Sequence, residues 1–299
     1  MADTIGFIGT GIMGTPMSKR LLAAGYHLVI YDSKPEAMAP LLALGAEAAV
    51  SPADVGERCP KVITMLPNSS IVEQVVLGKA GLADGMAAGS ILIDMSSSIP
   101  TSTQKIAAAL AEKGIEMIDA PVSGGHVGAT DGTLAIMVGG KEEIFQECLP
   151  VLQVMGKNIF HVGAVGAGDA MKTVNNLMSA INTLGMCEAM VLGAKAGLDP
   201  AKIVEVCSTG SARSYALDKK ATAIVLSDNY KPGFTTDLMY KDLDIATTLG
   251  RQIGVPMLAG NLVRELLAIL RGRGMNAIDY TAMVKLIEEG AGFKIVKPE

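Results

Sequence analysis

The sequence predicts an α/β domain with a parallel sheet, followed by an all-α domain. Two observations support this fold class. Short apolar runs alternate with helical patterns through the first half of the chain, and strand signals nearly disappear after Gly168. With 299 residues the chain is long enough for two domains, which we expect at residues 1–164 and 165–299.

Six apolar runs in the first half have the length and composition of buried strands. They lie at residues 5–9, 27–31, 62–66, 91–95, 115–119 and 134–138. Helical patterns at residues 16–24 and 35–44, and from about residues 71 and 101, separate the earlier runs. This alternation predicts a parallel sheet with right-handed crossovers. Aromatic residues make up only 4% of the chain, and the aliphatic excess fits a sheet covered by helices.

One long helix is predicted at the start of the second domain. Between Ala170 and Gly193 apolar residues recur at steps of three and four, with no proline. This interdomain helix is longer than the average helix, and its apolar surface is too large for one small neighbour. Further helical patterns lie at residues 200–207, 241–250 and 261–271. We therefore expect the helical domain to pack on its own copy as a homodimer or homotetramer.

A glycine-rich turn follows the first predicted strand and opens the first helix. Gly9, Gly11 and Gly14 form the pattern G-x-G-x-x-G, with Ile12 and Met13 between the last two glycines. Gly9 permits a tight turn, Gly11 allows close approach of a pyrophosphate, and Gly14 allows the helix to pack on the strand. Because the helix N-terminus attracts phosphate, we expect a Rossmann dinucleotide-binding domain.

Asp32 ends the second predicted strand, 18 residues after Gly14. A carboxylate at this place accepts hydrogen bonds from a ribose hydroxyl and repels the 2′-phosphate of NADP. NAD is therefore the predicted cofactor, although Lys34 would suit a phosphate and leaves NADP as the alternative.

Ser123, Gly124 and Gly125 follow the fifth predicted strand. A hydroxyl beside unhindered backbone N–H groups suits a substrate carboxylate. The alternative is an ordinary loop that uses glycine for its backbone freedom.

Lys172, Asn175 and Asn176 gather on an otherwise apolar helix. Lys172 and Asn176 are four residues apart and share a face, so burial without partners would be costly and a cleft is expected there. A lysine with a lowered pKa acts as a general acid or base. The alternative is a solvated lysine with polar neighbours.

Four motifs in order carry a family resemblance, at residues 9–14, 119–125, 168–176 and 241–243. They resemble the signature motifs of the β-hydroxyacid dehydrogenases. That family includes 3-hydroxyisobutyrate dehydrogenase, 2-hydroxy-3-oxopropionate (tartronate semialdehyde) reductase and 2-(hydroxymethyl)glutarate dehydrogenase. The resemblance spans nearly the whole chain. It implies reversible hydride transfer between NAD(H) and a small 3-hydroxy acid or semialdehyde.

The resemblance also implies roles for single residues. Lys172 matches the catalytic general acid–base. The residues that match substrate contacts are Ser123, Gly124, Gly125, Asn175 and Asn176. Those that match cofactor contacts, beside the glycine-rich turn, are Leu66, Pro67, Asn68, Ser97 and Lys241. Arg213 is a candidate partner for a second substrate carboxylate or, alternatively, an interface or surface arginine.

Several alternatives remain open at this point. Within the family, an NADPH-dependent succinic semialdehyde or glyoxylate reductase is the main one. 6-Phosphogluconate dehydrogenases share the architecture but are longer, and imine reductases usually lack the lysine. A non-catalytic dinucleotide-binding sensor is the alternative outside the enzymes, and we would expect such a protein to lack Lys172 and Asn176.

Composition argues against other classes of partner. The net charge is -5, and no cluster of Lys and Arg suggests nucleic-acid binding. The four cysteines are scattered, so we expect neither a zinc site nor a disulfide framework. Free cysteines are typical of a reducing compartment, so we expect a cytoplasmic location. Each apolar stretch is interrupted before 18 residues, so we expect no membrane span.

Overall fold

The computed structural model describes residues 3–296, and the chain forms two compact units. The first unit is Met1–Lys172 and the second is Thr173–Glu299. A sheet with covering helices in the first unit and a helical second unit confirm the predicted fold class.

One nine-stranded sheet forms the centre of the first unit among the described residues. Its strands are β1 (Thr4–Ile8), β2 (His27–Tyr31), β3 (Glu47–Ala48), β4 (Lys61–Thr64), β5 (Ile91–Asp94), β6 (Glu116–Asp119), β7 (Val122–Ser123), β8 (Leu134–Gly139) and β9 (Gly156–Gly163). The order is β3-β2-β1-β4-β5-β6-β8-β7, with β9 beside β8. The strands from β3 to β6 are parallel as predicted, whereas β8 runs antiparallel to β6 and β7.

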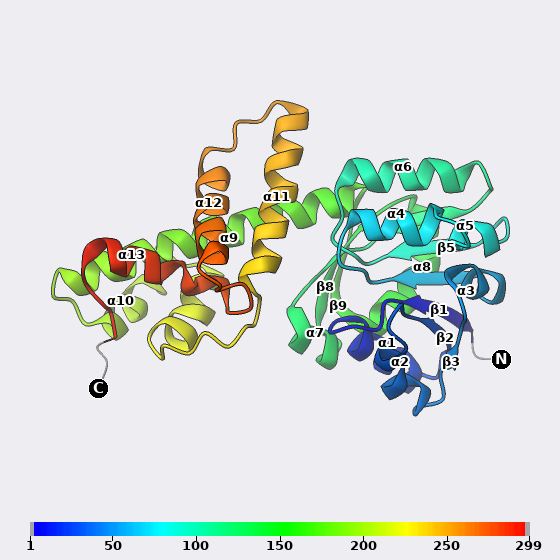
Figure 1. The fold of residues 1–299 in the computed structure, drawn as a ribbon, viewed down its shortest axis with the longest axis horizontal. Helices are drawn as coiled ribbons and strands as arrows, with labels where there is room; N and C mark the ends of the chain where they lie inside the picture. The colour runs from blue at the N-terminus through cyan, green and yellow to red at the C-terminus, as the bar shows by residue number, and fades with distance from the viewer. Residues whose placement is uncertain (1–2, 297–299) are drawn as a thin grey trace. The chain divides into compact units, whose positions relative to one another are not determined.

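Helices cover both faces of this sheet (Figure 1). They are α1 (Gly14–Ala23), α2 (Pro35–Leu42), α3 (Pro52–Arg58), α4 (Ser69–Leu77), α5 (Leu82–Gly85), α6 (Pro100–Ala111), α7 (Gly125–Asp131) and α8 (Glu142–Met155). Side chains alternate along a strand, so Leu28 and Ile30 pack with α1, α2 and α8 while Val29 packs with the layer of α3 to α6. Burial on both faces explains the continuous apolar runs of the sequence.

The carboxyl ends of the central strands meet at one edge of the sheet. Hydrogen bonds join the residues just past the strands: Gly9 N donates to Tyr31 O, Met65 N to Ile8 O, Met95 N to Thr64 O and Ala120 N to Asp94 O. The glycine-rich turn and the loops after β4, β5 and β6 therefore start side by side, where open α/β sheets bind ligands.

Seven elements of the first unit escaped the sequence analysis, and five of them are short. The predictions omit β3, β7 and β9 and the helices α3, α5, α7 and α8. The strand β9 carries Lys157, Asn158 and His161 and is only half-buried, so it lacks the apolar run that marks the central strands. The helices α5 and α7 are too short for a periodic pattern to emerge.

The elements of the second unit, within its described residues, are all helices, apart from an isolated β-bridge between Thr235 and Asp279. Its elements are α9 (Ala167–Lys195), which begins in the first unit, α10 (Pro200–Cys207), η1 (Ala216–Val225), α11 (Thr236–Ile253), α12 (Leu258–Gly272), η2 (Tyr280–Ala282) and α13 (Met283–Ala291). One core joins α9 to α11 and α12, and a second joins α9 to η1 and α13. The long predicted helix is thus present, while η1, a π-helix, and α13 were not predicted.

The surface of α9 differs from that of an ordinary core helix. Lys172 and Asn176 are buried, whereas the apolar side chains of Met171, Val174 and Met178 are 43–59% exposed. By length and composition α9 is able to cross a membrane, contrary to our expectation from the interrupted apolar stretches. This is weak evidence for a membrane span, because core helices of soluble proteins pass the same test.

Candidate functional site

The glycine-rich turn joins β1 to α1 in the conformation that its residue types require. Gly9 has φ +96°, and a Cβ there would collide with the carbonyl of Met65. A Cβ on Gly14 would collide with the carbonyl of Gly9, so close packing of helix on strand depends on glycine here. Gly11 faces open space, since a Cβ would meet nothing within 4 Å. The turn thus leaves a gap where a ligand is able to approach the backbone.

The first turn of α1 is open to a ligand. Met13 is the N-cap residue and makes no side-chain capping hydrogen bond, and the side chain of Ile12 is 79% exposed. Backbone N–H groups at a helix N-terminus with no side-chain cap bind phosphate. These residues fit the pyrophosphate of a dinucleotide.

Asp32 lies directly after β2 and contacts the same turn. Its Oδ2 accepts a hydrogen bond from Thr10 N at 2.8 Å, and its Oδ1 accepts one from Lys34 N at 2.9 Å. The carboxylate is therefore held in place by backbone N–H groups at the end of β2. This is the position from which a carboxylate reaches the ribose of NAD.

Two predicted cofactor loops follow β4 and β5. Leu66 N donates a hydrogen bond to Ser96 Oγ at 2.9 Å, which joins the two loops next to the half-buried Ser97. Pro67 comes between Leu66 and Asn68. The side-chain oxygen of Asn68 accepts from Ile71 N and so caps α4, which is a structural role as well.

The turn at Ser123–Gly125 joins β7 to α7. Gly124 has φ +133° and Gly125 has φ +60°, a conformation that side chains rarely adopt. Ser123 is half-buried at the end of the two-residue strand β7 and pairs with Ala135 of β8. The turn therefore presents a hydroxyl next to a sharply bent, unhindered backbone, which suits a carboxylate ligand.

Lys172 lies in the second turn of α9 and is the last residue of the first unit. Its side chain is buried, with only 8% of the residue exposed. The structure thus contradicts the alternative of a solvated lysine. A lysine removed from bulk water is suited to proton transfer.

Three buried carboxyl groups lie at the same sheet edge. Asp94 and Asp119 end β5 and β6, and Asp169 lies in the first turn of α9. Burial raises the pKa of Asp119 to about 6 and the pKa of Asp94 above its ordinary value. Burial, with the charges of Asp119 and Asp94 nearby, raises the pKa of Asp169 well above the usual range.

In the second unit the two predicted asparagines belong to a polar network of Asn175, Asn176, Asp242 and Lys241. Asn175 Nδ2 donates to Asn176 Oδ1 at 3.0 Å, and Asn176 Nδ2 donates to the carboxylate of Asp242. The other oxygen of Asp242 is 3.1 Å from Lys241 Nζ. The carboxylate therefore orients an amide and balances an ammonium group, and both of these were predicted site residues.

Arg213 makes no contact with that network. Its side chain is 71% exposed and forms an ion pair with Asp218, with Nε and Oδ2 2.9 Å apart. This hydrogen bond raises the pKa of Arg213 and lowers that of Asp218. The arrangement favours the surface interpretation for the structure as it stands, while a dicarboxylic ligand would compete with Asp218.

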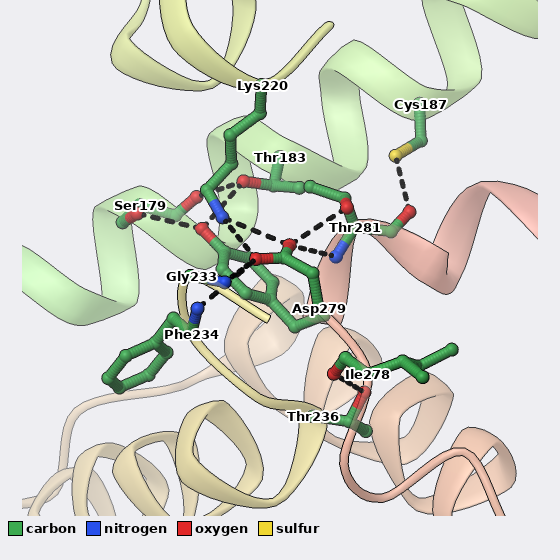
Figure 2. A network of polar contacts seen from close by, with 11 residues as sticks. Ser179, Thr183, Cys187, Lys220, Gly233, Phe234, Thr236, Ile278, Asp279 and Thr281 are labelled. Atoms are coloured by element: carbon green, nitrogen blue, oxygen red, sulfur yellow. Dashed lines mark hydrogen bonds and ion pairs between the residues drawn. The ribbon is translucent and has the colours of Figure 1, made fainter. Parts of the chain in front are cut away.

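A second polar network holds the helical unit together (Figure 2). Lys220 Nζ lies 3.1 Å from both oxygens of Asp279 and 4.2 Å from the ring centre of Tyr280. The hydroxyl of Tyr280 is 3.1 Å from Ser179 Oγ and from Thr183 Oγ1, both on α9. This network links η1 and η2 to the helix that carries the predicted asparagines.

Sequence reasoning missed the roles of several carboxylates. Asp119, Asp169 and Asp242 all lie within the four motifs, but no role was predicted for them. Two signals were available. Asp119 ends a strand just before the Ser123 turn, and Asp169 precedes Lys172 by one helical turn.

Comparison with known proteins decides the family. The family model described as the NAD binding domain of 6-phosphogluconate dehydrogenase matches residues 4–163. A second model, described as NAD-binding of NADP-dependent 3-hydroxyisobutyrate dehydrogenase, matches residues 166–287. The chain is 41% identical to 2-(hydroxymethyl)glutarate dehydrogenase of Eubacterium barkeri, over 97% of each protein. The chain belongs to the β-hydroxyacid dehydrogenase family.

Two further relatives extend this β-hydroxyacid dehydrogenase assignment. The mitochondrial 3-hydroxyisobutyrate dehydrogenase of Mus musculus is 36% identical over 97% of this chain and 88% of its own length. The structure of Mycobacterium tuberculosis 3-hydroxyisobutyrate dehydrogenase with L-serine has a TM-score of 0.91 and 31% identity, and the match covers 96% of this chain and 99% of that one. The β-hydroxyacid dehydrogenase is an oxidoreductase that acts on CH–OH groups with NAD as cofactor.

Within residues 3–296 no group of three or more His, Cys, Asp or Glu side chains is arranged to hold a metal ion. The cysteines Cys59, Cys148, Cys187 and Cys207 are not joined by disulfides.

Proposed function

We propose that this dehydrogenase oxidises the primary alcohol of a small acid, HOCH2–CHR–COO⁻, and reduces the matching semialdehyde, with Lys172 as general acid–base. The observation that carries the proposal is the burial of Lys172 on α9, in the same compact unit as the glycine-rich turn and the Ser123–Gly125 turn. One unit thus offers a dinucleotide site, a carboxylate site and a proton-transfer group.

The substrate class follows from what the relatives' names have in common. 2-(Hydroxymethyl)glutarate, 3-hydroxyisobutyrate and serine each carry a hydroxymethyl group on the carbon that bears a carboxylate. They differ in R, which is a propionate, a methyl or an ammonium group. Reduction of tartronate semialdehyde gives the same skeleton with a hydroxyl as R. The Ser123–Gly125 turn is the proposed anchor for the shared carboxylate.

NAD, when bound, supplies the hydride acceptor for alcohol oxidation, and NADH the donor for the reverse reaction. The residues of the chain bind and orient the substrate and the cofactor, and they move the proton. In the oxidative direction neutral Lys172 accepts the hydroxyl proton at Nζ as the C–H hydride leaves. In the reductive direction the Lys172 ammonium returns that proton to the aldehyde oxygen. Asn175 and Asn176 orient the substrate, while Leu66, Pro67, Asn68, Ser97 and Lys241 contact the cofactor.

The choice of R depends in this proposal on Arg213. If R carries a second carboxylate, as in 2-(hydroxymethyl)glutarate, Arg213 exchanges its ion pair with Asp218 for one with substrate. Arg213→Ala should then lower kcat/KM for that substrate roughly 10- to 100-fold and spare 3-hydroxyisobutyrate. An unchanged kcat/KM for both substrates would assign Arg213 to the surface.

The decisive experiment combines a substrate panel with a lysine variant. We would measure kcat/KM for 3-hydroxyisobutyrate, 2-(hydroxymethyl)glutarate, L-serine and tartronate semialdehyde, with NAD(H) and NADP(H). Lys172→Ala should lower kcat about 10²- to 10⁴-fold while NADH binding stays near normal. Lys195→Ala, which changes an exposed lysine near the end of α9, is the matched control. Full activity in Lys172→Ala would refute the assigned role.

Assembly and location are also proposed. Met171, Val174, Met178 and Leu192 leave apolar surface exposed along α9, which supports a homodimer or homotetramer. Light scattering that gave the mass of a monomer would contradict this. We propose that the enzyme is cytoplasmic, and cell fractionation would test that location.

A further inference from the structure

We propose that Asp119 and Asp169 are positioning residues that fix the helix of Lys172 to the carboxylate turn and to a cofactor loop. Both carboxylates lie in the first unit, and this positioning role rests on the roles proposed above for Lys172, the Ser123–Gly125 turn and Ser97.

Asp119 connects the carboxylate turn to the start of α9. Its Oδ1 accepts a hydrogen bond from Gly166 N at 2.7 Å, and its Oδ2 accepts one from Asp169 N at 2.8 Å. Asp169 lies in the first turn of α9 and Gly166 directly precedes that helix. Backbone N–H groups at a helix N-terminus lack helical partners and attract a negative charge. Asp119 also ends β6, only four residues before Ser123. A shift of this carboxylate therefore moves α9 relative to the turn.

Asp169 connects the same helix to the loop after β5. Its Oδ1 accepts from Ser98 N at 3.0 Å, and its Oδ2 accepts from Thr103 Oγ1 at 2.7 Å in α6. Ser98 directly follows Ser97, a proposed cofactor contact. Lys172 follows Asp169 by three residues, so the two lie on neighbouring positions of one helix face. The carboxylate thus links the lysine-bearing turn to the cofactor loop.

Two glycines make room for this junction. A Cβ on Gly168 would lie 2.8 Å from Asp119 Oδ2, and a Cβ on Gly139 would lie 2.5 Å from Asp119 Oδ1. Atoms at those distances are in steric conflict, so any larger residue would displace the carboxylate or the helix. The space around Asp119 is therefore filled by the helix start itself.

Burying two carboxyl groups at this junction is less favourable than capping a helix from an exposed position. Burial raises the pKa of Asp119 to about 6 and that of Asp169 well above its usual range, which means that ionising them inside the fold is unfavourable. In contrast, Asp199 caps α10 from an exposed position by accepting from Ala201 N. The buried pair also connects distant parts of the sequence. Asp119 and Asp169 are 50 positions apart, and Ser98 and Asp169 are 71 positions apart. Such costs are typical of sites where geometry serves function.

Three variants test the proposal. Asp169→Ala removes both acceptor oxygens, whereas Asp169→Asn keeps an oxygen for Ser98 N and gains an amide that donates to the Thr103 hydroxyl. We expect Asp169→Ala to lower kcat per NADH-binding site roughly 10- to 100-fold. Asp169→Asn should stay within about threefold of wild type, because both contacts survive. Asp199→Ala, the control, loses a cap but should keep kcat within about twofold.

A second readout does not depend on turnover. Amide hydrogen exchange in peptides that span residues 96–99 and 164–172 should accelerate in Asp169→Ala and stay slow in Asp169→Asn and Asp199→Ala. If the wild type binds NADH but turns over no panel substrate, the proposed function fails and the exchange rates alone decide on the positioning role. Wild-type kcat and exchange in Asp169→Ala would overturn the proposal. Equal losses in the Ala and Asn variants would also overturn it, because charge rather than contact would then matter.

Discussion

The helix α9 is held in two different ways along its length. In the first unit, Asp119 accepts hydrogen bonds from the backbone at the start of α9, and Asp169 in its first turn accepts them from Ser98 N and the Thr103 hydroxyl. In the second unit, Ser179 and Thr183 contact the hydroxyl of Tyr280, and the Lys220–Asp279 ion pair lies against that ring. One junction is built on carboxylates and helix-end dipoles, and the other on a buried ion pair.

The two junctions should respond differently to pH and to mutation. A carboxylate with a raised pKa changes its charge near neutral pH, so the first junction should be sensitive to pH. A buried ion pair gives little net stability, but the loss of one partner leaves an uncompensated charge. The second junction should therefore be sensitive to mutation.

The largest expected effect is the loss of Asp279. Asp279→Ala leaves the Lys220 ammonium buried without its carboxylate, and the N–H groups of Gly233 and Phe234 lose their acceptor. We expect the free energy of unfolding to fall by about 3–5 kcal/mol. Urea unfolding followed by far-UV circular dichroism measures this change. A loss as small as that of an exposed cap variant, Asp199→Ala, would show that the ion pair is not a structural centre.

The pH dependence of stability should expose the first junction. The folded-state pKa of Asp119 is about 6, above its ordinary 3.8, so protonation favours the folded state. The contribution is complete below pH 3.8 and is lost as pH rises through about 6. Relative to Asp119→Asn, the wild type should lose up to about 3 kcal/mol of unfolding free energy between pH 4 and pH 7. Parallel curves for both proteins in urea unfolding at four pH values would contradict the sign.

Lys220→Met removes the other partner of the ion pair. Without the lysine, Asp279 still accepts hydrogen bonds from the N–H groups of Gly233, Phe234 and Thr281 and from the Thr281 hydroxyl. We expect a loss of roughly 1–3 kcal/mol, smaller than for Asp279→Ala, because the remaining charge stays solvated by donors. The same urea titration ranks the two variants. The reverse order would mean that the lysine, and not the carboxylate, organises this site.

The sequence predicted those parts of the molecule that depend on local patterns. Buried runs such as residues 27–31 gave strands, and the glycine spacing at residues 9–14 gave a turn whose conformation requires glycine. The edge at which Leu66 and Ser97 lie follows from the parallel pairing of β4 and β5.

What escaped the sequence depends on contacts between distant residues. The partners of Asp169 are Ser98 and Thr103, about 70 positions away, and nothing in the local pattern identifies them. Lys220 follows Asp218 and Lys219, where no local pattern identifies a distant partner, yet it is buried against Asp279. Helical periodicity placed Met171 and Val174 among the regular apolar positions, but the structure buries the lysine between them.

The smallest and most specific effect should come from Tyr280→Phe. The change removes one hydroxyl from the contact with α9 and leaves the ring that Lys220 lies against. Thr183 keeps its bond to the carbonyl of Ser179, so no buried donor is left without an acceptor there. We expect a loss of about 0.5–1.5 kcal/mol in urea unfolding. If kcat also falls in Tyr280→Phe while kcat of Asp199→Ala stays unchanged, the second junction positions the part of α9 that carries Asn175 and Asn176. Its role would then be the same as the role proposed for the first junction and Lys172. Unchanged kcat would restrict the positioning role to the carboxylate junction and leave the ion pair as a purely structural support.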